Sequence, residues 1–282
     1  MKRISELKTE AKASFKAKYW PAVGIGLLGY VIVGGLSAIP AVGWLLSLLV
    51  GTIISVGLVG FYIQVYRGEE LKVESLFAPF NRYGRVLGGS LWMYLWLFLW
   101  SLIFVIPFVV YFVSMALSAI FSSGDFFMNA ANMEMMNGWS NWDWFGALFH
   151  PAWLLLFLLL IPMIIKSFSY FCTTFILADS PNVPATSALD ISKKITNGFK
   201  GKIFLTGLSF ILWYLPMIAS GILMGLSTLG FGFFVAGVIG YIASGALQVF
   251  YVLPYYSTTM AALYQEMKDN AKAKGIEGTE LL

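Results

Sequence analysis

Residues 87–113 read LGGSLWMYLWLFLWSLIFVIPFVVYFV and contain no charged side chain. About 20 apolar residues of helix cross the roughly 30 Å hydrocarbon core of a bilayer, so this stretch is long enough to span one. The rest of the chain has the same character, because 59% of the 282 residues are hydrophobic and only 11% are charged. Soluble domains carry about 25% charged residues. The sequence therefore predicts a membrane protein.

Five further stretches share this length and composition. The six predicted spans cover residues 20–39, 42–65, 87–113, 153–177, 203–228 and 231–263. Backbone polar groups within lipid must be satisfied inside each segment, which favours helices, and a β-barrel would show short alternating strands instead. We predict an all-α, polytopic membrane helix bundle with six transmembrane helices, forming a single integral membrane domain over residues 1–282.

The distribution of basic residues predicts the orientation of this bundle. Seventeen of the 18 Lys and Arg residues lie in four segments, namely residues 1–18, 67–85, 193–202 and 268–274. Short cytoplasmic loops carry an excess of Lys and Arg. Both termini are therefore predicted to be cytoplasmic, with residues 122–150 on the outside and the protein in the cell membrane. The net charge of +4 suits an anionic inner leaflet, and nothing indicates a nucleic-acid partner.

Two cytoplasmic segments have an amphipathic pattern. In residues 1–19, apolar side chains recur at helical spacing from Ile4 to Phe15 beside a row of lysines, which predicts an interfacial helix. This helix is interpreted either as a docking surface or as an anchor for the first span. Residues 178–202 begin near Pro184 and reach a stop signal at Gly198. They predict a short helix beneath the bundle.

Prolines and glycines predict local features of the spans. Four prolines fall inside predicted spans: Pro107, Pro162, Pro216 and Pro254. A proline removes a backbone hydrogen bond and bends a helix, so kinks and a cavity between them are expected. Gly221 and Gly225 form a GxxxG motif, which predicts close helix packing, with a homodimer interface as the alternative.

Sets of catalytic residues are missing from the sequence. The chain has one histidine, His150, and one cysteine, Cys172, and it lacks paired carboxylates, a nucleophile elbow and a phosphate-binding loop sequence. We predict no enzymatic activity, no cofactor and no metal site. Four outer methionines could bind copper(I) together with His150, although the Asn and Trp residues among them favour an ordinary interfacial loop. These methionines are Met128, Met133, Met135 and Met136.

Lys166 is the one ionisable residue within a predicted span. A charge at the bilayer centre costs about 3 kcal/mol on insertion scales, so Lys166 should snorkel to the headgroups or meet a partner. The functional interpretation is a contact with a lipid phosphate, supported by Tyr170 one turn further on and by Lys193, Lys194 and Lys200. The alternative is simple snorkelling.

Two adjoining stretches resemble a known family. Residues 161–181 read IPMIIKSFSYFCTTFILADSP and residues 187–213 read SALDISKKITNGFKGKIFLTGLSFILW. They are similar to a bacterial integral membrane family, domain of unknown function 975. The motif residues, in the order of the family pattern, are Pro162, Lys166, Tyr170, Asp179, Pro181, Ser192, Gly198, Lys200 and Pro254. Met163 and Thr196 depart from the pattern, which has glycine and methionine there.

The resemblance also bears on function. The family is distantly similar to the membrane domain fused to some glycerophosphodiester phosphodiesterases, but no catalytic residue carries over. The cytoplasmic Lys and aromatic clusters and the missing sets of catalytic residues lead us to predict a non-enzymatic membrane module. This module would bind or organise lipid, with anionic phospholipid at the cytoplasmic face, or a membrane protein partner such as a second copy of the chain. The alternative is a small-solute or lipid transporter with a path between kinked helices.

Overall fold

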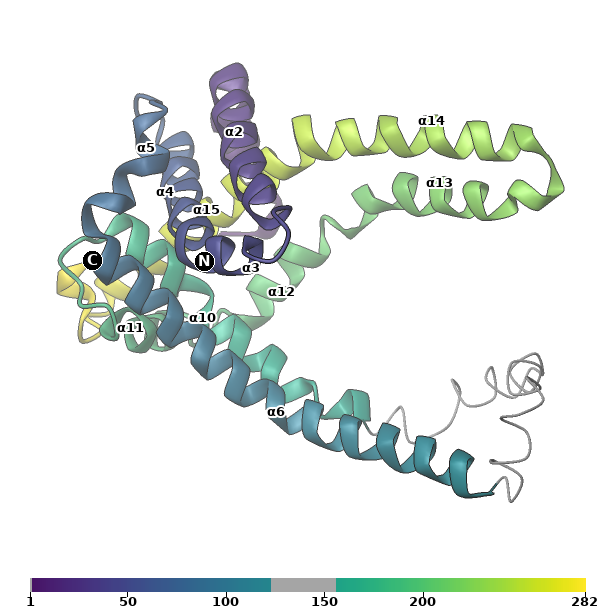
Figure 1. The fold of residues 1–282 in the computed structure, drawn as a ribbon. Helices are drawn as coiled ribbons and strands as arrows, with labels where there is room; N and C mark the ends of the chain where they lie inside the picture. Colours follow the sequence, from purple (N-terminus) through teal and green to yellow (C-terminus); the bar gives the residue numbers. More distant parts are fainter. Residues whose placement is uncertain (1, 123–155) are drawn as a thin grey trace. The chain divides into compact units, whose positions relative to one another are not determined.

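The computed structural model describes residues 2–122 and 156–282 (Figure 1). All regular structure within these residues is helical, which confirms the all-α prediction. In these two ranges, six helical stretches are long and apolar enough to cross a membrane: Tyr19–Ser37, Gly43–Arg67, Glu74–Ser114, Leu156–Asp179, Lys200–Thr228 and Phe231–Ala273. The chain is a multi-pass membrane protein.

The α-helices follow the order shown in Figure 1. They are α1 (Ile4–Ala17), α2 (Tyr19–Ser37), α3 (Gly43–Leu46), α4 (Thr52–Arg67), α5 (Glu74–Phe77), α6 (Tyr83–Ser122), α10 (Ile161–Asp179), α11 (Ser187–Ile195), α12 (Lys200–Leu208), α13 (Leu215–Gly225), α14 (Phe231–Leu247) and α15 (Leu253–Ala273). Single π-helical turns join α3 to α4 and α14 to α15.

The chain divides into two compact units. One unit holds residues 1–93 and 168–282, and the other holds residues 94–167. The single-domain arrangement stays a prediction. The outer segment with its methionines and His150, together with the start of the fourth predicted span, lies outside the described residues.

Helix α1 packs against other helices of the protein, whereas its amphipathic pattern predicts a helix at the membrane interface. Its apolar residues Leu7, Ala11 and Phe15 are completely buried, because α1 packs on α4 and α15. The Phe15 ring contacts the Tyr251 ring, and the Tyr255 hydroxyl of α15 donates to the Lys8 carbonyl of α1. Helix α15 continues to Ala273, ten residues past the predicted end of the last span. The helix is amphipathic as expected, but protein rather than lipid covers its apolar side.

Two of the four prolines mark helix starts. Pro162 and Pro216 are each the second residue of a helix, namely α10 and α13. The N–H groups of the first turn have no partner within a helix, so a proline is well tolerated there. Pro107 lies inside α6. Pro254 follows the π-helical turn Gln248–Val252, which joins α14 to α15 without a break. The predicted spans therefore hold breaks at two prolines and interior prolines at two.

Glycine packing between α13 and α14 does not use the predicted GxxxG motif. No atom lies within 4 Å of the Cβ positions of Gly221 and Gly225. Gly237 of α14 faces α13 instead, where an added Cβ would lie 2.6 Å from the Met224 side chain and 2.9 Å from the Ser220 carbonyl oxygen. Figure 1 shows these two helices side by side. Close packing occurs as expected, but a different helix supplies the glycine.

Candidate functional site

Asp179, the last residue of α10, lies at the centre of a charged cluster. Its two carboxylate oxygens accept hydrogen bonds from the Arg67 guanidinium at 2.6 and 2.9 Å. Lys268 and the Tyr264 hydroxyl of α15 donate to one of these oxygens at 2.5 and 3.2 Å. The side chains of Asp179 and Lys268 are only 7% and 10% exposed. We call Arg67, Asp179, Tyr264 and Lys268 the Asp179 cluster.

The ends of α4 and α10 and the interior of α15 bring this cluster together. Arg67 is the last residue of α4, and Gly68 follows it in the left-handed conformation at φ 73°, which ends the helix without steric strain. Arg67 also donates to the Gln265 side chain at 2.7 and 3.1 Å. Fork-like guanidinium pairing with a carboxylate is geometrically specific. The cluster therefore sets how α4, α10 and α15 meet.

Arg85 of α6 holds the end of α10 in another way. Its guanidinium donates to the backbone carbonyls of Leu177, Ser180 and Val183 at 3.0, 2.5 and 2.6 Å. The last carbonyls of a helix lack partners within the helix and carry partial negative charge. Arg85 satisfies such groups, yet no carboxylate neutralises its charge among the described residues.

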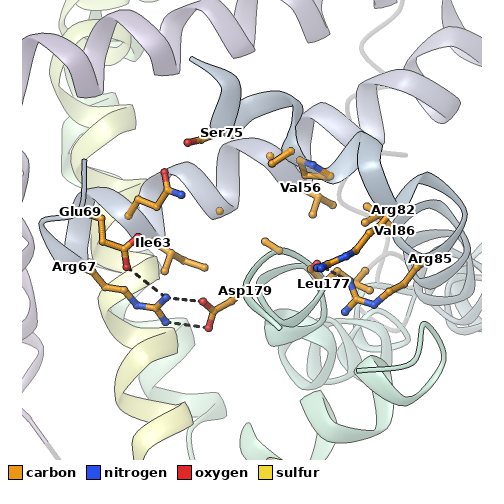
Figure 2. Close-up of a pocket in the computed structure, with 16 residues that line it drawn as sticks. Val56, Ile63, Arg67, Glu69, Ser75, Arg82, Arg85, Val86, Leu177 and Asp179 are labelled. Atoms are coloured by element: carbon orange, nitrogen blue, oxygen red, sulfur yellow. Dashed lines mark hydrogen bonds and ion pairs between the residues drawn. The ribbon is translucent and has the colours of Figure 1, made fainter. Parts of the chain in front are cut away.

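A cavity of about 240 Å³ lies beside the Asp179 cluster. Its charged lining residues are Arg67, Glu69, Arg82, Arg85 and Asp179. Figure 2 shows Arg67, Glu69 and Asp179 on one side of it and Arg82 and Arg85 on the opposite side. We call this cavity the arginine pocket. It brings together side chains from α4, α6 and α10 and from the short 3-10 helix Ala78–Arg82.

The arginine pocket has a surplus of positive charge. Three guanidinium groups face two carboxylates, and Asp179 is already shared between Arg67 and Lys268. Arg82 is exposed and has no hydrogen bond or ion pair within residues 2–122 and 156–282. Its donors remain available, so the pocket can accept an anion. Arginine suits this task because its planar fork matches phosphate and carboxylate geometry.

A polar group without a partner also lines the pocket. The side-chain oxygen of Gln64 is buried and accepts no hydrogen bond from any described residue. Buried polar groups are normally paired, and leaving one unpaired costs about 1–3 kcal/mol.

The residues that the sequence predicted as headgroup contacts belong to two different units. Lys166 lies in the unit of residues 94–167, where its ammonium group is 4.7 Å from the centre of the Trp100 ring. This cation–π contact provides the partner that a lysine within a span requires. In the other unit, Tyr170 is buried beneath Lys193, with 5.7 Å between the ammonium group and the ring centre. The arginine pocket includes none of these residues.

Lys194 and Lys200 also lie apart from the arginine pocket. The Lys194 ammonium forms an ion pair with Glu277 at 2.8 Å. This hydrogen bond lowers the pKa of the Glu277 carboxyl below its ordinary value. Lys200 is the first residue of α12 and is half-buried. The role of all these lysines in headgroup binding stays a prediction.

The remaining motif residues support the fold around α10. The Ser192 hydroxyl of α11 donates to the Ser169 carbonyl of α10 at 2.9 Å. Gly198 adopts φ 84° in the turn before α12, a conformation that favours glycine. Pro181 lies in the turn that follows α10. Of the motif residues, Asp179 is the one that lines the arginine pocket.

Sequence reasoning missed Arg67, Arg82, Arg85 and Lys268 as members of a site. One usable signal is the position of Asp179 at the end of an apolar run, because a carboxylate near lipid needs a cationic partner. Several cytoplasmic basic residues could have met that need, so the signal does not name the partner. Among the described residues, no group of three or more His, Cys, Asp or Glu side chains could hold a metal ion.

Comparison with known proteins finds one family. The family model described as "Protein of unknown function (DUF975)" matches residues 1–271. Neither the comparison with curated proteins nor that with solved structures found a match.

Proposed function

The chain belongs to the DUF975 family, and from that premise we propose that it is a non-enzymatic membrane module that binds anionic lipid through the arginine pocket. The observation that carries the proposal is Arg82, an exposed guanidinium with no described partner on the wall of a net positive cavity. A phospholipid phosphate is an anion of suitable chemistry, because guanidinium and phosphate form strong paired hydrogen bonds.

The depth of the pocket in the membrane supports a headgroup as the ligand. Its charged residues belong to segments that the positive-inside rule predicts to be cytoplasmic, at the ends of three spans. Phospholipid phosphates lie at this boundary, and the inner leaflet is anionic. A pocket here can take a headgroup without drawing the lipid out of the bilayer.

Replacing Arg82 by alanine is expected to weaken the retention of phosphatidylglycerol by about tenfold, the loss of one charge-assisted hydrogen bond. The measurement is native mass spectrometry of protein released from bilayers of phosphatidylglycerol and phosphatidylcholine. Arg82 is exposed and forms no bond within the described chain, so the fold should persist.

Lys72→Ala is the matched control, because Lys72 is 58% exposed, lies ten residues before Arg82 and pairs with Glu70 outside the pocket. Unchanged retention by Arg82→Ala, or an equal loss in both variants, would contradict the headgroup site. Lys166→Ala in the same assay tests the contact predicted from the sequence as a separate question.

The cell membrane is the proposed location, with both termini in the cytoplasm. A cysteine introduced at position 132 is expected to react with an impermeant maleimide on intact cells. The natural Cys172 is completely buried, so the unmodified chain serves as an unlabelled control. Reaction only after lysis would reverse the proposed orientation.

A small-solute or lipid transporter is the alternative function. The helix breaks at Pro162 and Pro216 and the π-helical turn before Pro254 favour it, because interrupted spans provide sites and hinges in transporters. We also propose that the chain binds a membrane protein partner or a second copy of itself. Its similarity to the membrane domain of glycerophosphodiester phosphodiesterases is a separate proposal.

A further inference from the structure

Two guanidinium groups on one wall of the arginine pocket have no counter-charge among the described residues. Arg82 ends the 3-10 helix Ala78–Arg82, and Arg85 lies in the first turn of α6. Residues three apart on a helical backbone are neighbours on its surface, and Figure 2 shows both side chains on the same side of the pocket. Arg85 donates to three backbone carbonyls, which carry no formal charge. Arg82 pairs with no described residue, so this wall keeps two positive charges.

The opposite wall of the pocket is electrically balanced. Asp179 pairs with Arg67 at 2.6 Å and with Lys268 at 2.5 Å. Glu69 lies 3.9 Å from the same Arg67 guanidinium. Two carboxylates therefore meet two cationic groups on this side. The positive surplus of the pocket lies on the wall that carries Arg82.

The free donors and the size of the pocket suit a small anion with several oxygens. A guanidinium has five N–H donors. Arg85 uses three of its donors for carbonyls, and the donors of Arg82 have no described acceptor. The volume of about 240 Å³ is below the about 300–1,000 Å³ of sites for drug-sized molecules. A phosphate group without a bulky second substituent fits both properties.

We propose that the arginine pocket selects a phosphate monoester over a phosphate diester. A monoester carries about 1.5 to 2 negative charges at neutral pH and has three terminal acceptor oxygens. A diester such as phosphatidylglycerol carries one charge and has two such oxygens. The monoester thus matches the two free guanidinium charges, whereas a diester leaves one of them without a counter-charge. The inference rests on the proposed headgroup site and names the chemical class that this site selects.

Native mass spectrometry at pH 8 tests this selectivity. The protein is released from bilayers with equal amounts of phosphatidate and phosphatidylmethanol, which differ by one methyl group and one charge. We expect wild type to retain phosphatidate over phosphatidylmethanol by about tenfold, the effect of one charge-assisted hydrogen bond. Equal retention of the two lipids overturns the selectivity, and the headgroup site still stands if Arg82→Ala lowers the retention of both. If Arg82→Ala retains both lipids as wild type does, the headgroup site fails as well.

Two variants should change this retention ratio in opposite directions. Arg82→Gln removes one of the two free charges and should lower the ratio by about fivefold. Glu69→Gln removes a carboxylate that faces Arg67 and should raise the ratio by about twofold, the effect of a partly exposed charge. Misfolding does not explain a rise.

Lys72→Gln is the matched control, because it removes one positive charge from a side chain that is 58% exposed and outside the pocket. It should leave the ratio unchanged. An equal fall of the ratio in Lys72→Gln and Arg82→Gln overturns the inference, as does a ratio that Arg82→Gln leaves unchanged or that Glu69→Gln lowers.

Glycerol 3-phosphate separates the two sources of a phosphate monoester, a lipid and a soluble ester. It is added in excess to wild type that carries phosphatidate, beside sodium chloride of the same ionic strength. Displacement by glycerol 3-phosphate alone assigns the pocket to soluble monoesters. Phosphatidate that stays bound under both conditions assigns it to the lipid. Equal displacement by sodium chloride shows attraction to surface charge only and overturns the inference.

Discussion

Replacing Asp179 by asparagine is expected to lower the free energy of unfolding by about 3 kcal/mol, because removing one partner of a buried ion pair leaves its cationic partners without a counter-charge. Arg67 and Lys268 both donate to this carboxylate, and the Lys268 side chain is 10% exposed. Asparagine keeps the shape of the side chain. The loss therefore reports charge rather than packing. Titration with SDS in mixed micelles measures the unfolding free energy.

Asp190→Asn provides the matched control for this measurement. Asp190 pairs with Lys193 at 2.9 Å, but these side chains are 67% and 40% exposed. Exposed ion pairs contribute about 0–1 kcal/mol, so this variant should unfold almost like wild type. A structural role for the Asp179 cluster would be contradicted if the two variants lost similar amounts of unfolding free energy. It would also be contradicted if Asp179→Asn unfolded with the same free energy as wild type.

Replacing Gly57 by alanine is expected to destabilise the protein by about 2–3 kcal/mol through overpacking. An added Cβ would overlap the backbone carbonyl oxygen of Leu76 and lie 2.8 Å from its carbonyl carbon. A backbone cannot rotate away as a side chain can, so α5 would have to shift from α4. Because Gly57 also lines the arginine pocket, the same variant should lose retained phosphatidylglycerol.

Gly60→Ala is the control on the same helix. Its Cβ would lie 3.5 Å from the Ala178 Cβ, an ordinary van der Waals contact. Alanine also favours a helix over glycine by up to about 1 kcal/mol. We expect unchanged or slightly higher stability. A Gly57→Ala protein as stable as Gly60→Ala would show that α5 does not pack on α4 as described.

The helical spans could be predicted from the sequence because span formation depends on local properties. The predicted range 42–65 corresponds to the observed stretch Gly43–Arg67, and the range 231–263 begins where α14 begins. The end of the last helix was predicted ten residues too early, because α15 continues to Ala273 beyond the apolar run. Helix α15 packs on α1, and a span-length argument does not include such contacts.

The candidate site was only partly predictable. Asp179 was identified through its motif, whereas Arg67, its main partner, is 112 residues away in the sequence. Lys166 was the main site residue predicted from the sequence, yet its described contact is with the Trp100 ring. Burial and pairing depend on which helix ends meet, and the hydropathy of a segment carries no information on that.

By itself, the sequence determined that this is an all-helical, multi-pass membrane protein of the DUF975 family, because apolar length and backbone hydrogen bonding act within each segment. The tertiary structure decided which charges neutralise one another and which remain available. It also decided that protein covers the apolar face of α1. These outcomes arise from side chains of different helices meeting at atomic distances, where geometry rather than composition determines the energy.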